Sequence, residues 1–164
     1  MNLTYSEVGA TREGPLPPGY RHVTRRIRLG SGPEVFRTAA EALAHWRPQR
    51  GAGLRVRTGA ERAGLGVEFA TGIGAGPLRL WVPCRIVWVV DEPDRYGYGF
   101  GTLPGHVADG EEAFLLGMDA GGDVWFEVRA FSRPATWWAK LGGPVTRLVQ
   151  SRVTDGYAAA MRGL

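Results

Sequence analysis

The sequence predicts an α+β fold, in which antiparallel strands are followed by one long C-terminal helix. Apolar and polar residues alternate between short turns from Leu54 to Phe131, which is typical of a meander of strands. From Pro144 to Leu164 the apolar residues recur every three or four positions, so they share one face of a helix. A chain of 164 residues can bury most of its apolar surface in a single core, and no second domain is required.

The first 19 residues are expected to form an irregular arm, and residues 20–164 the single domain. Pro15, Pro17 and Pro18 close the arm, and proline interrupts both helices and strand ladders. The segment from Tyr20 to Leu29 alternates as the first strand.

A helix is predicted to follow over residues 30–49. Ser31 and Glu34 have the spacing of a capping box, and Pro33 suits the first helical turn. The apolar stripe of this helix consists of Phe36, Ala39, Ala40, Leu43 and Trp46. Pro48 marks the predicted end, so only one helix is expected between the first two strands.

The other strands are predicted at residues 54–58, 66–73, 78–90, 96–103, 111–118 and 124–131, which gives a sheet of about seven strands. Pro83 lies inside the longest apolar run and is predicted to mark a bulge. A short helical segment, TWWAKL, precedes the pair Gly142-Gly143, which interrupts or kinks it before the long helix begins.

Composition and charge limit the classes of function. With 44% hydrophobic and 22% charged residues, the chain is typical of a globular protein. The formal net charge is +4, but basic aromatic platforms and known recognition motifs are absent, so no nucleic-acid partner is expected. The single cysteine, Cys84, forms no internal disulfide, and no apolar leader or membrane-spanning run is evident. We therefore expect a cytoplasmic protein without membrane insertion.

No cofactor or metal ion is expected. The segment GIGAGP, residues 72–77, is similar to a dinucleotide-binding loop but leads into a strand instead of a helix. His22, His45 and His106 lie on three different elements without the spacing of zinc ligands. Cys84 would be a nucleophile if it paired with His106, but its apolar neighbours favour an inert buried thiol.

The stretch from Tyr96 to Phe114 contains the densest cluster of potentially reactive side chains. We name His106 and Glu112 as candidate catalytic residues, because an inward-pointing Glu112 would have a raised pKa and His106 could approach it across the loop. The alternative is that Pro104, Gly105 and Gly110 only shape a turn, in which His106 and the carboxylates are solvated or bond the loop's own amides.

Symmetric hairpins would place the even-numbered residues of four strands on one concave face. This face either fills the core or lines a cavity for a hydrophobic or aromatic small molecule, with Tyr96, Tyr98, Thr102 and Glu112 as its polar groups. The candidate ligand-binding residues are Trp88, Tyr98, Phe100, Thr102, Phe114, Phe126, Trp137, Trp138, Val149 and Tyr157.

The opposite, convex face is predicted to need a cover. Gly97, Gly99 and Gly101 leave a shallow apolar floor there, beside Val87, Val89, Leu115 and Trp125. The apolar residues of the arm that are available to fill it are Leu3, Tyr5 and Val8. A second subunit is the other possible cover, and the oligomeric state stays open.

Two resemblances extend this interpretation. The element order resembles the helix-grip fold of the START-like superfamily, which implies a curved sheet wrapped around the last helix and a cavity between them. At the level of motifs, the chain resembles the uncharacterised family called domain of unknown function nineteen-ninety, which implies no established activity. The matching segments are VGATR (8–12), AGLRV (52–56), DEPDRYGYGFGTLPGH (91–106), GEEAF (110–114) and WFEVRAFSRPATWWAKLGGPVTRLVQ (125–150).

Three classes of function follow. The favoured one is a module that binds a hydrophobic small molecule. The second is an enzyme of the cyclase, hydratase or hydrolase type that occurs in the START-like superfamily, using His106 and Glu112. The third is a structural or interaction protein whose core is filled.

Overall fold

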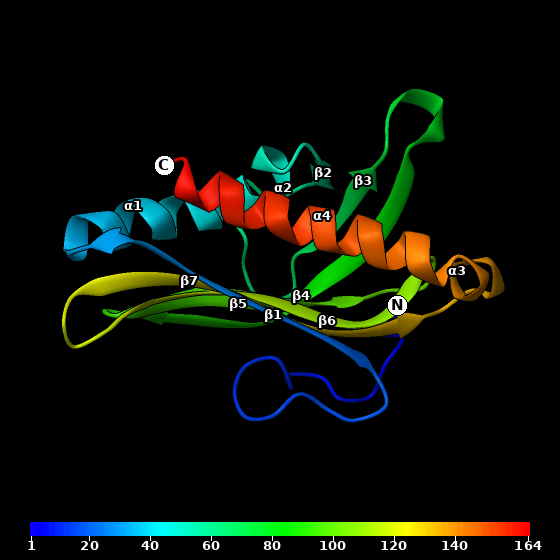
Figure 1. The fold of residues 1–164 in the computed structure, drawn as a ribbon, viewed down its shortest axis with the longest axis horizontal. Helices are drawn as coiled ribbons and strands as arrows, with labels where there is room; N and C mark the ends of the chain where they lie inside the picture. Colours follow the sequence, from blue (N-terminus) through cyan, green and yellow to red (C-terminus); the bar gives the residue numbers. More distant parts are fainter.

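Seven antiparallel strands form one curved sheet, and the helices lie on its concave face (Figure 1). The computed structural model describes residues 1–164. The spatial order is β1-β7-β6-β5-β4-β3-β2, so every strand from β2 to β7 lies beside its neighbour in sequence and β1 joins the far edge. The strands are β1 (Arg21–Ser31), β2 (Arg55–Thr58), β3 (Glu68–Ile73), β4 (Leu80–Glu92), β5 (Arg95–Thr102), β6 (Ala108–Met118) and β7 (Asp123–Pro134).

The long C-terminal helix lies across this sheet, as predicted. The helical elements are α1 (Pro33–Ala44), α2 (Arg47–Gly51), the 3-10 turn η1 (Gly76–Leu78), α3 (Trp137–Leu141) and α4 (Gly143–Arg162). None of these helices is long and apolar enough to cross a membrane.

Two helices separate β1 from β2, so the prediction of a single helix is wrong. Trp46 adopts a left-handed conformation with φ of 67° and ends the first helix, while its fully buried ring anchors the corner. Pro48 lies in the first turn of α2, where its missing N–H costs nothing. The predicted capping box is also absent, because Gly32 is the N-cap and Glu34 pairs with Arg37 instead.

The bulge in β4 is at a different position from the one predicted. Pro83 pairs in regular register with Ala70, and the register shifts between Ile86 and Trp88. One residue added to a strand reverses which face each later side chain occupies. Trp88 therefore lies on the convex face, opposite Gly99, and the prediction that it shares the concave face with Phe100 is wrong.

The core between sheet and helices is built from aromatic rings. Phe114 lies at the centre of this core. The centroid of its ring is 5.3 Å from the ring centroid of Phe100, 5.8 Å from that of Tyr98 and 4.9 Å from that of Tyr157 in α4. The C-terminal half of α4 comes close to α2 because the residues between them are small: a Cβ on Gly51 would overlap Ala160, and a Cβ on Gly156 would meet Ala52. This half of the helix is therefore tightly packed.

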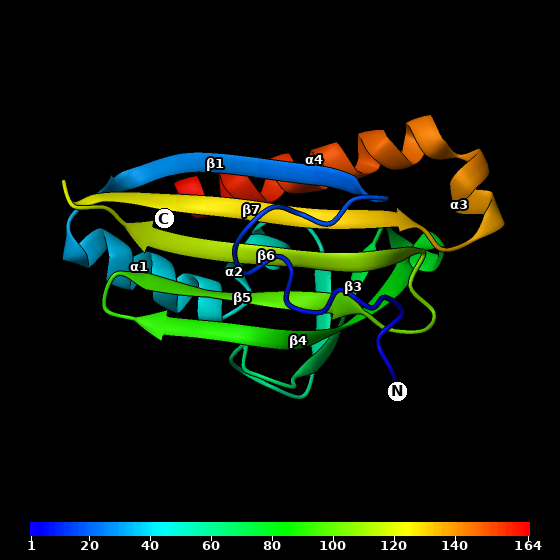
Figure 2. The ribbon, with the colours of Figure 1, turned by 90° about the horizontal axis from the view of Figure 1, so that it is seen from below.

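The first 20 residues lie across the convex face of the sheet, which is the face that we predicted they would cover (Figure 2). A side chain on Gly101 would overlap the Tyr5 ring, and one on Gly99 would overlap the Trp88 indole. The glycines of β5 thus leave space for two aromatic rings. Val89, predicted on this face, packs against the concave core instead because of the β4 bulge.

Candidate functional site

Half of the predicted ligand-binding residues pack in the core. Tyr98, Phe100, Phe114, Phe126 and Tyr157 are all buried and stack in a connected series of edge-on and tilted rings. Burial raises the pKa of Tyr98 and of Tyr157, so both phenols stay neutral. These rings therefore contact one another and fill this part of the core.

The other predicted residues on the helices are exposed at one end of the molecule. Trp137 is 73% exposed, Trp138 48% and Val149 41%. We call the exposed large apolar residues of α3 and the first half of α4 the apolar end; they are Trp137, Trp138, Leu141, Val145, Leu148 and Val149. The β3–β4 hairpin, with the exposed side chains of Leu78 and Leu80, lies at the same end of the molecule (Figure 1).

Exposure divides the apolar stripe of α4 into two parts. Tyr157, Ala160 and Met161 near the C-terminus are buried, whereas Val145 and Val149 near the N-terminus are exposed. Apolar residues at helical spacing normally pack against a neighbouring element. Here the stripe continues about two turns beyond Val153, the first residue of the stripe that packs against the core.

Glu112 points to the concave face between these two parts. It pairs across the sheet with Phe100 and with Ala130, while the next inward residue of β6, Phe114, contacts Tyr157. Towards the apolar end, Ser132 accepts a hydrogen bond of 3.2 Å from Gln150 of α4. Glu112 thus lies below α4 where the packed core ends.

The carboxyl group of Glu112 has no hydrogen-bond or ion-pair partner in the protein. The residue is partly exposed, and its low-dielectric surroundings raise its pKa from 4.5 to about 8. A carboxyl group with this pKa is mostly protonated at pH 7, so it offers both a hydrogen-bond donor and an acceptor. Its inward direction and raised pKa were both predicted.

His106 does not join Glu112. Its Nδ1 accepts a 3.0 Å hydrogen bond from the Ala108 amide, so the side chain bonds its own loop, as the alternative interpretation described. Burial lowers the pKa of His106 to about 4, with a smaller opposing effect from Asp109. Because the two side chains share neither a hydrogen bond nor an ion pair, they form no acid/base pair in this structure.

Thr102, another polar candidate, also bonds within the protein. The Thr102 hydroxyl accepts a 3.0 Å hydrogen bond from the Gly110 amide and contacts the hydroxyl of Thr4 in the arm. Burial raises the pKa of Tyr96, and burial also raises the pKa of the Cys84 thiol, which is therefore inert. No three His, Cys, Asp or Glu side chains are close enough together to hold a metal ion.

Glu111 was not among the predicted site residues, yet it accepts more hydrogen bonds than any other side chain of the convex face. Its carboxylate is 2% exposed and accepts hydrogen bonds from Tyr5 Oη at 2.7 Å, from the Gly9 amide at 2.7 Å and from Trp88 Nε1 at 3.2 Å. The Thr11 amide and hydroxyl also donate to it. This one carboxylate therefore fixes the arm to the sheet. The sequence feature that could have indicated this contact is the pair of motifs VGATR and GEEAF, which contain Gly9, Thr11 and Glu111 and for which no mutual contact was predicted.

Comparison with known proteins places these motifs in a family. A family model described as Domain of unknown function (DUF1990) matches residues 4–160. A "UPF0548 protein" from Deinococcus radiodurans is 36% identical over 94% of this chain and 83% of its own length. Another from Arabidopsis thaliana is 32% identical over 76% of this chain and 63% of its own length.

Solved structures share the fold at low sequence identity. TTHA0849 from Thermus thermophilus has a TM-score of 0.62 and 12% identity, covering 87% of this chain and 95% of its own. A START superfamily protein from Mycobacterium smegmatis has a TM-score of 0.57 and 12% identity over 88% and 96% of the two chains. Norcoclaurine synthase from Thalictrum flavum, solved with a transition state analogue, has a TM-score of 0.58 and 10% identity over 87% and 94%. These likenesses confirm the predicted START-like, helix-grip fold.

Proposed function

The chain belongs to the family described as Domain of unknown function (DUF1990), and from its geometry we propose that it binds a hydrophobic small molecule at the apolar end. The observation that carries this proposal is the uncovered half of the α4 stripe. Tyr157 and Met161 belong to this stripe and are buried in the core. Val145 and Val149 continue the same stripe, yet they are exposed. A contiguous exposed apolar surface on a globular domain marks a binding site.

Glu112 supplies the polar part of the proposed site. It lies where the packed core ends, it is partly exposed, and no protein group satisfies it. A ligand hydroxyl or carbonyl group that reached it would replace the missing hydrogen bond. Sites for small molecules are typically concave and mostly apolar, with a few such polar groups that fix the orientation of the ligand.

The likeness to other helix-grip proteins supports the same class of function. The norcoclaurine synthase of this fold was solved with a transition state analogue, so the fold is compatible with a bound small molecule in that protein. An enzyme using His106 and Glu112 is less well supported, because the two side chains do not meet. A structural or interaction protein with a filled core is supported by the ring packing around Phe114 and by the exposed apolar end, but it gives no role to the unpaired carboxyl group of Glu112.

An uncharged fluorescent probe tests the proposal. N-phenyl-1-naphthylamine is expected to bind the wild-type protein, and Val149→Asp is expected to weaken its binding about tenfold or more, because the probe would have to desolvate a carboxylate. Val149 is exposed, so the substitution is expected to leave the fold intact.

The matched control is Leu65→Asp, at an apolar residue that is 71% exposed in the loop between β2 and β3. This variant is expected to bind the probe as the wild type does. Equal loss of binding in both variants, or no binding by the wild type, would refute the proposal.

A further inference from the structure

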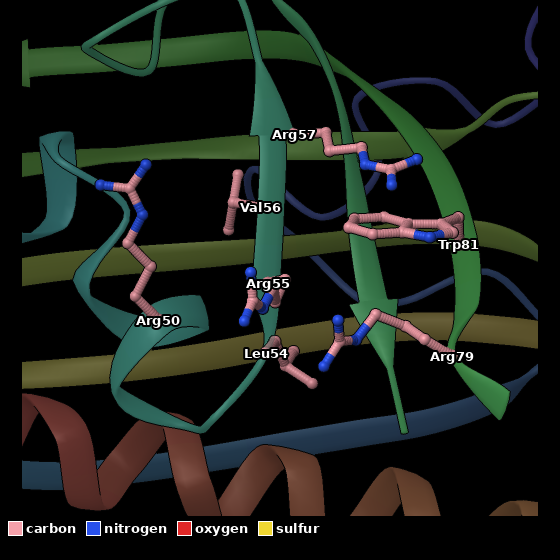
Figure 3. Close-up of a pocket in the computed structure, with 7 residues that line it drawn as sticks. All are labelled: Arg50, Leu54, Arg55, Val56, Arg57, Arg79 and Trp81. Atoms are coloured by element: carbon pink, nitrogen blue, oxygen red, sulfur yellow. The ribbon is translucent and has the colours of Figure 1, made fainter. Parts of the chain in front are cut away.

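A hollow of the surface outside the apolar end has quite different chemistry. It has a volume of about 410 Å³ and lies on β2, the start of β4 and the adjacent helix α2 (Figure 3). Its lining residues are Arg50, Leu54, Arg55, Val56, Arg57, Arg79 and Trp81. We call it the arginine pocket. Four of its seven residues are arginines, and none is acidic.

The β-sheet register forms this pocket around a glycine. Gly72 of β3 lies between Arg55 of β2 and Trp81 of β4 in one cross-strand row. A Cβ at Gly72 would overlap the Arg79 side chain and press against the Trp81 ring. Because Gly72 has no side chain, the stem of Arg79 can lie flat across β3 beside the indole.

The indole of Trp81 holds the guanidinium group of Arg57 in place. The guanidinium carbon of Arg57 is 3.6 Å from the ring centroid of Trp81, which is a close cation–π contact. In Figure 3 the Arg57 and Arg79 side chains lie on either side of the indole. Guanidinium groups fixed in this way lose less conformational entropy when they bind a ligand.

The charge of the pocket is not balanced within the protein. Arg25, Arg28, Arg62 and Arg85 each form an ion pair with a carboxylate elsewhere on the molecule. By contrast, the side chains of Arg50, Arg55, Arg57 and Arg79 make no ion pair or hydrogen bond. The Nε–H of Arg79 is moreover buried without any partner, and an unsatisfied buried donor on a charged group is costly.

A purely structural role explains only part of this arrangement. β2 is an edge strand, and outward-pointing charges on an edge discourage pairing with another sheet. That role accounts for Arg55 and Arg57. It accounts neither for the buried donor of Arg79 nor for the arginine on α2, which faces the same hollow without being part of the edge.

We propose that the arginine pocket binds a small phosphate-bearing anion. Arginine donates paired, parallel hydrogen bonds that match phosphate oxygens, and several arginines without competing acids favour a group with more than one negative charge. The ligand would give Arg79 Nε–H its missing acceptor. The pocket shares no lining residue with the apolar end, so the two proposals can fail independently.

The probe for the test is inorganic pyrophosphate, with binding measured by isothermal titration calorimetry on the full chain. Arg55→Gln and Arg79→Gln are each expected to weaken binding about tenfold or more, because each removes hydrogen bonds between charged groups. Arg152→Gln is the matched control, since Arg152 is an exposed arginine of α4 outside the pocket and without an ion pair. It is expected to change the affinity less than twofold.

A nuclear magnetic resonance spectrum gives a second readout. The buried Arg79 Nε–H is expected to exchange slowly enough to give a resolved signal, and pyrophosphate is expected to shift it. Val149→Asp is expected to leave pyrophosphate binding unchanged.

Failure of the wild type to bind pyrophosphate at millimolar concentration, or equal losses in Arg55→Gln and Arg152→Gln, would overturn the inference. So would tight binding of a single-stranded oligonucleotide that depends on Arg55 while pyrophosphate does not bind.

Discussion

Glu111 and Glu112 are adjacent in sequence and lie on opposite faces of β6, so they have opposite environments. Glu111 accepts hydrogen bonds from Tyr5, Gly9, Thr11 and Trp88. Glu112 has no partner, and burial raises its pKa to about 8. The alternation of side chains along a strand predicted that Glu112 points inward. It could not show which of the two carboxylates would receive hydrogen bonds from the rest of the chain. That depends on where an arm about 100 positions earlier in the sequence crosses the sheet.

The raised pKa of Glu112 has a consequence for stability. Between pH 4.5 and pH 8 the unfolded chain releases the proton while the folded protein retains it, so the free energy of unfolding falls as pH rises through this range. Glu112→Gln removes the titrating carboxyl group, and with it this fall in the free energy of unfolding. Thermal unfolding at pH 9 should show the variant about 1 to 2 kcal/mol more stable than the wild type, or roughly 3 to 6 °C, after allowing for solvent screening. At pH 4 the two should agree closely.

The neighbouring substitution serves as the contrast. Glu111→Gln places amide donors against the donors of the arm, and it should destabilise the protein by about 2 kcal/mol or more at both pH values. If Glu112→Gln shows the same difference from wild type at pH 4 and at pH 9, the raised pKa of Glu112 is refuted.

At the scale of elements, local patterns predicted the strands and the long helix, and the errors occurred where one residue decides the geometry. Trp46 ends α1 in a left-handed conformation that burial of its ring compensates. The bulge in β4 lies in an unbroken apolar run, IVWVV, in which both faces are buried, so no change of polarity marks it. The face of Trp88 was mispredicted for this reason.

The glycine positions of β5 lead to a prediction about the arm. A methyl group at Gly101 would overlap the Tyr5 ring, so Gly101→Ala should displace the arm and lower the free energy of unfolding by about 1 to 3 kcal/mol. Limited proteolysis should then cut within the first 20 residues sooner than in the wild type.

Two comparisons isolate the cause. Gly117→Ala, on the adjacent strand, has nothing within 4 Å of the added carbon and should be nearly neutral. In a Tyr5→Ala background, Gly101→Ala should lower the free energy of unfolding much less, because the ring that the new methyl group would overlap is absent. An equal cost in both backgrounds would mean that the arm does not rest on Gly101.

At the scale of the whole molecule, the sequence predicted the architecture but not whether the space inside it is filled. The alternation of side chains along a strand and the spacing of apolar residues along a helix show which side chains face each other. Whether they touch depends on how closely α4 approaches its neighbours. The small residues Gly51, Ala52, Gly156 and Ala160 allow a close approach of α4 to α2 for one half of the helix only. The other half, from Val145 to Val149, is left exposed at the apolar end. The candidate site follows from this difference between the two halves of one helix.

Intermolecular nuclear Overhauser effects between N-phenyl-1-naphthylamine and valine methyl groups test the apolar end most directly. The methyl groups of Val145 and Val149 are exposed there, whereas those of Val124 and Val128 are fully buried in the core. We expect effects from the bound probe to Val145 and Val149 and none to Val124 or Val128. Effects confined to the core valines, or bound probe without any contact to Val145 and Val149, would contradict the proposal that this surface is the binding site.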